Sequence, residues 1–159
     1  MAKTDPRFAP LQMSVTTQLY DEIRGLWLEH VTNEEKLFAP VSEEEWDRYL
    51  GVILDTLTDD CVMELRSAGM RAEGQDGARE FYETFIPSFE DMHWVPQALV
   101  IGPQGVLDVA DMTGRLVRPF GGLDAVGERL STEWVIYFPW DPERHKFRGE
   151  TIYSIRRVD

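Results

Sequence analysis

The N-terminal third of the chain carries apolar residues at the spacing of helices. Two runs recur every three or four positions, and a polar link with Pro40 separates them. Such spacing lines one face of an α-helix. The pattern predicts a first helix from Ser14 to about Thr32, and a second that opens at Ser42, with Glu45 completing a capping box. The apolar positions are Val15, Leu19, Ile23, Leu26, Trp27 and Val31 in the first run, and Trp46, Tyr49, Leu50, Ile53, Leu54 and Leu57 in the second.

The middle of the chain, residues 54–89, changes character twice. An acidic turn at 58–60 is followed by a short apolar segment, 61–65, which is typical of a strand. A Gly-rich crossing then leads to a third predicted helix that opens at Asp76. Its apolar face consists of Ala78, Phe81, Tyr82 and Phe85.

From His93 onward the apolar residues follow period two, which indicates β-strands. The predicted strands are 93–101, 106–117, 130–140 and 146–157, with a hairpin turn at 102–105 and a longer loop at 119–127. Helices followed by a long meander predict an α+β fold, in which a curved antiparallel sheet wraps over the N-terminal helices. A twisted sheet of this kind leaves an apolar pocket where it diverges from the helices.

Length and composition fit one soluble domain. The chain has 159 residues, enough for a self-sufficient core. We expect residues 1–13, with Pro6 and Pro10, to form a flexible arm and residues 14–159 to form the domain. Neither a signal peptide nor a membrane-spanning run is recognisable. The expected location is cytoplasmic.

Charge and cysteine content narrow the possible partners. The net charge of −13 argues against nucleic acid and against anionic membranes, because both are bound through Lys and Arg. Cys61 is the single cysteine, and it lies in an apolar strand, so a buried inert thiol is expected.

The order of these elements and several short motifs resemble a known family. The motifs are LTDDCVMEL, AREFYETF, PSFEDMHW, VLDVADMTG and KFRGETIY, within residues 42–155. They are similar to the nuclear transport factor two-like superfamily, and within it to the SnoaL-like, polyketide cyclase-like group. The resemblance implies a cystatin-like cone with a hydrophobic pocket. It also implies a homodimer, which is common in this superfamily.

The resemblance leaves the reaction open, because one fold hosts many functions. Enzymes of the superfamily share a hydrophobic cavity in which a carboxylate or a His moves a proton. An isomerase of the ketosteroid type is not expected, since Leu65 and Trp134 stand near the positions of its two acids. Paired His residues of the dehydratase kind are also missing from the sequence.

Asp111 is the first candidate for a catalytic carboxylate. It shares one face of the predicted strand 106–117 with Leu107, Val109 and Thr113. If that face lines the pocket, desolvation would raise the pKa of Asp111 and suit it to proton transfer. The alternative is that this face lies outside. Asp108 has the opposite parity, so at most one of the two should point inward from a regular strand.

Two further candidates for proton transfer are His93 and Glu150. Glu150 lies on the last strand with Ile152, although a surface ion-pair ladder with Arg148 and Arg156 is an equal alternative. His93 begins the first long strand, where it is either an acid or base or a structural residue.

The candidate substrate-binding residues are aromatic. Tyr49, Trp134 and Tyr20 would form a wall of the pocket or orient a ligand, although each also fits a plain core position. Trp94 and Trp134 need not share a wall, because their sequence neighbourhoods give them opposite parity. We expect no metal and no cofactor, since three scattered His residues and one Cys give no ligand spacing, and no phosphate loop is present.

Two functions stay open at this stage, and so does the question whether the chain is an enzyme. The first is a cofactor-independent lyase, isomerase or cyclase that binds a small hydrophobic carbonyl compound and moves a proton with a pocket carboxylate. The second is a non-catalytic module that binds a small ligand or forms a dimer.

Overall fold

The computed structural model describes residues 14–158, so the predicted arm at 1–13 lies outside the described part. The helices are α1 (Thr17–Lys36), α2 (Glu43–Asp55) and α3 (Gly74–Phe85), with short 3-10 turns at Arg66–Ala68 and Ile86–Ser88. The strands are β1 (Leu57–Leu65), β2 (Met70–Glu73), β3 (Phe89–Gly102), β4 (Gly105–Leu116), β5 (Arg129–Asp141) and β6 (Lys146–Arg157). The predicted α+β class is confirmed.

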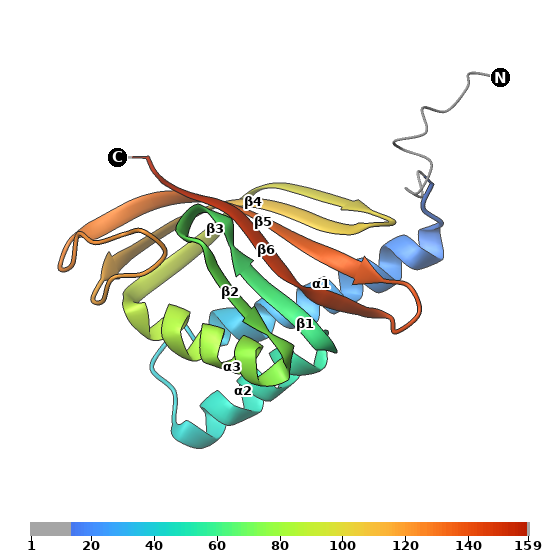
Figure 1. Cartoon of the computed structure of the whole chain (residues 1–159), viewed down its shortest axis with the longest axis horizontal. Helices are drawn as coiled ribbons and strands as arrows, with labels where there is room; N and C mark the ends of the chain where they lie inside the picture. Colours follow the sequence, from blue (N-terminus) through green and yellow to red (C-terminus); the bar gives the residue numbers. More distant parts are fainter. Residues whose placement is uncertain (1–13, 159) are drawn as a thin grey trace.

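The strands form one curved sheet in the order β2-β1-β6-β5-β4-β3, and the helices cover one of its faces (Figure 1). The sheet is not purely antiparallel as expected, because β1 and β6 run parallel. Parallel neighbours need a long connection, and here the whole chain between the two strands supplies it. The sequence pattern also missed β2, which pairs antiparallel with β1 from the Gly-rich crossing.

Local capping fixes where the helices begin. The capping box of Ser42 and Glu45 is present as predicted. For α1 the cap is Thr16 rather than Ser14, since the Thr16 side chain accepts a hydrogen bond from the backbone N–H of Leu19. The helix also continues one turn beyond Thr32, to Lys36. That extra turn carries Glu34 into the lining of the cavity described below.

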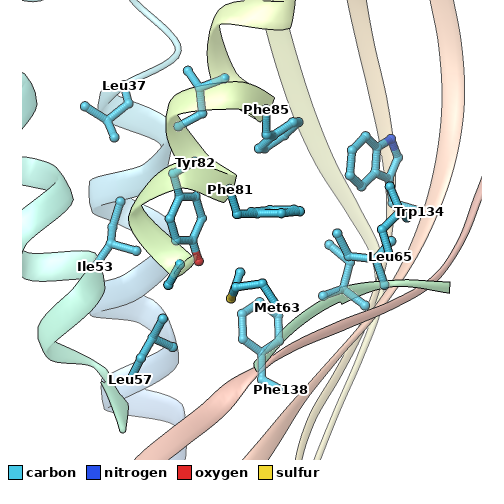
Figure 2. Packing of buried hydrophobic residues seen from close by; sticks show 14 of the residues in the cluster. Leu37, Ile53, Leu57, Met63, Leu65, Phe81, Tyr82, Phe85, Trp134 and Phe138 are labelled. Carbon is cyan, nitrogen blue, oxygen red and sulfur yellow. The ribbon is translucent and has the colours of Figure 1, made fainter. Parts of the chain in front are cut away.

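The hydrophobic core lies between the helices and the concave face of the sheet. Figure 2 shows Phe81 and Phe85 of α3 projecting toward Trp134 and Phe138 of β5. Alternate residues of β5 are buried as the period-two pattern predicted: Leu130, Thr132, Trp134, Ile136, Phe138 and Trp140. Within residues 14–158 no helix is long and apolar enough to cross a membrane.

Candidate functional site

A narrow cavity lies where α1 and α3 diverge from the sheet. The centre of a water molecule can occupy about 20 Å³ of it, so the cavity has room for about one water. Counting all space between the lining atoms and the open mouth, the volume is about 420 Å³. Its walls are mainly aromatic: Phe38, Phe81, Phe85, Trp94, Trp134 and Phe138. Its polar lining is entirely acidic: Glu34, Glu35, Asp108 and Glu150.

His30 of α1 and Glu150 of β6 form the buried polar centre beside this cavity. Nε2 of His30 lies 2.9 Å from Oε1 of Glu150, and their side chains are 0% and 4% exposed. Tyr82 of α3 donates a short hydrogen bond to the same Oε1, and its hydroxyl lies 3.1 Å from Nε2. Burial and the Glu150 carboxylate raise the pKa of Tyr82 well above its usual value, so this hydroxyl is a proton donor.

The hydrogen-bond network orients the ring of His30. Nδ1 lies 2.7 Å from Oγ1 of Thr56, and this hydroxyl already donates to the carbonyl oxygen of Ile53 at 2.6 Å. Thr56 must therefore accept, and Nδ1 must carry the proton. Nε2 is left to share a single proton with Glu150, so the pair is either imidazolium with carboxylate or imidazole with carboxylic acid.

A backbone irregularity aims Glu150 inward. Phe147, Glu150 and Ile152 are all buried, although Phe147 has the opposite parity to the other two. Register shifts in the pairing of β6 with both neighbours absorb the difference. Gly149 lies in this irregular segment with a φ of 119°, and a Cβ there would meet the carbonyl oxygen of Val62 at 2.0 Å. Glycine is thus required at position 149, next to the point where β6 turns the carboxylate of Glu150 toward the helices.

Asp108 of β4 faces the same cavity. The residue is 1% exposed, and its Oδ1 has no hydrogen-bond partner among the described residues. Burial raises the pKa of Asp108 to about 6, a hydrogen bond from Trp94 opposes the rise, and the charge of Glu150 adds to it. A desolvated carboxylate with a free oxygen suits proton transfer near neutral pH.

Glu34 completes the acidic lining from the last turns of α1. Its Oε2 lies 3.8 Å from Nε2 of His30, and its side chain is 16% exposed. Burial raises the pKa of Glu34 well above its usual value, and the charges of Glu150, Asp108 and Glu35 add to the effect. No Lys or Arg is among the described residues that line the cavity, so its charge is not balanced by a fixed cation.

The inward carboxylate of β4 is Asp108, and the expectation for Asp111 requires correction. In the pairing of β4 with β5, Asp108 lies opposite Ile136 and Asp111 lies opposite Glu133. Residues opposite each other in a sheet share a face. Ile136 lines the cavity, whereas Glu133 binds Arg156 on the outer side, so Asp111 points away from the cavity.

The other predicted residues are dispersed. His93 is exposed on β3 and lies in a shallow depression with Phe38 and Asp91, not in the cavity. The hydroxyl of Tyr49 accepts a hydrogen bond from Arg48 outside the cavity, and Tyr20 is 37% exposed on α1.

Glu150 and Trp134 do line the cavity. Trp94 lies there too, with its ring centroid 5.4 Å from that of Trp134. The expectation that these two rings need not share a wall is therefore corrected. Register shifts in β3 break the simple parity from which that expectation came.

His30, Glu34 and Glu150 are the group that could hold a metal ion. The nitrogen of His30 and one oxygen of each carboxylate lie within 4.8 Å of one another, the only such group found in residues 14–158. In the sequence, His30 is one of three scattered histidines that show no metal-ligand spacing. One signal was available, because His30 and Glu34 are four residues apart, which is the spacing of one helical face, although the predicted helix ended at about Thr32. Nothing in the sequence indicated that Glu150 would meet them.

Comparisons with known proteins agree with the fold. A SnoaL-like protein from Agrobacterium tumefaciens, described as a polyketide cyclase, is similar over 82% of this chain and 89% of its own, with 13% identity and a TM-score of 0.61. An NTF2-like protein of unknown function from Exiguobacterium sp. 255-15 is similar over 84% and 98%, with 12% identity and a TM-score of 0.59. AclR from Streptomyces galilaeus, described as a candidate hydroxylase, is similar over 86% and 80%, with 18% identity and a TM-score of 0.58. Identities this low establish the fold alone.

A search of curated protein sequences gave no match. The model of the SnoaL-like domain family matches residues 35–157, which is most of the chain and includes Asp108 and Glu150. Most of α1, with His30 and Glu34, lies before the matched segment. By this match, the chain belongs to the SnoaL-like domain family.

Proposed function

We propose that the protein binds a small hydrophobic carbonyl compound in this cavity and moves a proton on it without an organic cofactor, as an isomerase, lyase or cyclase does. The observation that carries the proposal is Asp108, a buried carboxylate with an unpartnered oxygen among aromatic walls. Membership of the SnoaL-like family supports a role of the cyclase or isomerase kind.

In this proposal Asp108 is the general base. Its Oδ1 takes the proton from the carbon next to the carbonyl, and the electron pair of that C–H bond moves onto the carbonyl oxygen as an enolate. The proton that His30 and Glu150 share is the second mobile proton, and it neutralises the enolate or passes to a leaving group. Trp134 and Phe85 supply the apolar walls that keep water out.

The cavity must widen for such a substrate to enter. Its closed form has room for about one water, whereas a cyclic ketone is several times larger. Phe38 and Trp94 border both the cavity and the neighbouring surface depression, so they lie at its mouth. Rotation of these two side chains would join the cavity to a surface depression of about 870 Å³, solvent included.

The test measures exchange of carbon-bound hydrogen. The protein is incubated in deuterated buffer with a panel of small cyclic ketones and β-keto esters, and loss of the α-proton signal is followed by NMR. We expect catalysed exchange by the native chain and a loss of about 10²–10⁴-fold in Asp108→Asn. Asp111→Asn, on the opposite face of the same strand, should exchange at the native rate. Equal exchange by the native chain and Asp108→Asn would sink the proposal, and so would no catalysis on any compound.

We also infer that the chain forms a homodimer through the outer side of the β3–β4 hairpin. Val95 and Val100 of β3 and Leu107 of β4 are 37–60% exposed there, on the same face as Asp111. β3 is also an edge strand, so its outer backbone groups are open to pairing with a second copy. If the native chain shows no exchange, this surface favours the non-catalytic module. Light scattering of the native chain against Val100→Glu tests the dimer, which the charge should dissociate.

A further inference from the structure

We propose that His30, Glu34 and Glu150 form a binding site for a divalent transition-metal ion, of which Zn²⁺ is the representative. The inference goes beyond the proposed proton transfer and does not depend on it, because metal binding can be measured without a substrate.

The ring of His30 is prepared as a ligand. Its Nδ1–H donates to Thr56, whose own hydroxyl is committed to the carbonyl oxygen of Ile53. Nε2 is therefore the nitrogen that faces the carboxylates, and its lone pair becomes available to an ion that displaces the proton shared with Glu150. Metal-binding histidines are usually held in this way by a hydrogen bond from the other ring nitrogen. Tyr82 similarly orients Glu150 by donating to its Oε1.

The spacing of the ligand atoms fits a four-coordinate ion. Nε2 of His30 lies 2.9 Å from Oε1 of Glu150 and 3.8 Å from Oε2 of Glu34. Zn–N and Zn–O bonds of about 2.0–2.1 Å place the ligands of a tetrahedral ion about 3.3 Å apart. The two distances bracket this value, so small rotations of the carboxylates suffice.

Charge and an unsatisfied group point to the same occupant. Four carboxylates, those of Glu34, Glu35, Asp108 and Glu150, line a cavity that has no Lys or Arg among its described lining residues. Asp108 stands apart from the three proposed ligands, yet its buried Oδ1 has no partner and faces the same space. A water molecule on the open fourth position of a bound ion would satisfy that oxygen. In its closed form the cavity has room for about one water, and therefore also for a single ion.

Metal binding releases protons from the ligand side chains. The ion takes the place of the proton that His30 and Glu150 share, and any proton on Glu34 is released to solvent. Held by His30, Glu34 and Glu150, a bound ion would supply Lewis-acid polarisation of a substrate carbonyl in place of the shared proton. Asp108 keeps its place as the base.

The test uses the full chain after dialysis against a chelator. Zn²⁺ is titrated by calorimetry, and the bound metal is counted by mass spectrometry after desalting. Co²⁺ serves as a second probe, because its visible absorption reports a four-coordinate site. We expect one ion per chain, and at least a tenfold weaker affinity in Glu34→Gln. Glu34 is the preferred position, since its side chain makes no hydrogen bond in the described structure and its replacement should leave the fold intact.

Two control variants distinguish metal binding at this site from metal binding at the surface. His145 and Glu22 form an exposed pair with Nδ1 and Oε1 2.6 Å apart, so His145→Gln removes the competing surface site. Glu29→Gln removes an exposed charge of α1 that is not among the residues lining the cavity. Both variants should keep the native stoichiometry and affinity. No binding by the native chain, undiminished binding in Glu34→Gln, or loss in His145→Gln alone would overturn the proposal.

Discussion

His30 and Glu150, 120 positions apart in the sequence, place Nε2 and Oε1 2.9 Å apart in the interior. One residue comes from the first helix and the other from the last strand, so this contact joins the two ends of the chain. Both side chains are almost fully buried, and breaking such a pair leaves an uncompensated polar group. The pair therefore contributes to stability as well as to the proposed chemistry.

Tyr82→Phe tests how much the network stabilises the fold. The change keeps the ring and removes the hydroxyl that donates to Glu150. A hydrogen bond to a charged group is worth about 1.5–3 kcal/mol, and we expect a loss of that size in the free energy of unfolding. Urea denaturation measures it. Tyr153→Phe is the matched control, because Tyr153 is 43% exposed, and its stability should stay within about 0.5 kcal/mol of native. Equal stability of the two variants would show that the Tyr82 bond is energetically idle.

Asp108 should lower the free energy of unfolding as pH rises through the weakly acidic range. Its pKa is raised from 3.8 to about 6 in the folded protein, mainly by burial. The folded state therefore holds this proton more tightly than the unfolded state does. The stabilisation is fully present below pH 3.8 and is lost as pH rises through about 6.

Asp108→Asn should remove that dependence. The groups that face Asp108 are Trp94 from β3, Glu34 from α1 and Glu150 from β6, and all three remain in the variant. At pH 7.5 in metal-free buffer, we expect the variant to be about 1–2 kcal/mol more stable than the native chain, with little difference at pH 4. Denaturation at both pH values is the measurement, with Asp111→Asn as control. A variant less stable than native at pH 7.5 would mean that Asp108 has a structural partner.

Gly149→Ala should disrupt the β1–β6 pairing. A Cβ would come within 2.0 Å of the carbonyl oxygen of Val62 and would require a left-handed φ of 119°. We expect a loss of more than about 3 kcal/mol in the free energy of unfolding. Gly25→Ala, with no atom within 4 Å of the new Cβ in the middle of α1, should instead stabilise by about 0.5–1 kcal/mol. If Gly149→Ala unfolds with native stability, the irregular backbone there is not required.

The same glycine shows where prediction from sequence ends. Periodicity gave the helices, the long strands and the buried face of β5, because each depends on neighbours within a few residues. The parallel contact of β1 with β6 depends on residues far apart, and no local pattern encodes it. The glycine-containing irregularity of β6 changes the parity that a regular strand would keep.

The candidate site was predicted only in part for similar reasons. Both faces of β4 carry apolar residues, Val106 and Met112 on one and Leu107 and Val109 on the other, so the sequence did not identify the inward face. The register of β4 with β5 places Asp108 on the inward face. His30 lies on a helix whose pattern was recognised as core, and its partner Glu150 comes from the opposite end of the chain.

The reactivity of Cys61 can be compared between the folded and the unfolded chain, because it is the single cysteine and all thiol labelling reports on it. Burial raises the pKa of its thiol from 9.0 to about 11, and the charges of Asp60 and Glu150 add to the effect. Since the thiolate is the reactive form, a shift of two pH units lowers its fraction at pH 8 by roughly 100-fold. We expect iodoacetamide to label the native chain at least 100-fold more slowly than the chain unfolded in guanidinium at the same pH. The native rate should rise about tenfold for each pH unit up to about 11, while the fold persists. Labelling at similar rates in both states would mean that the strand β1 opens readily and that Cys61 is not protected by the core.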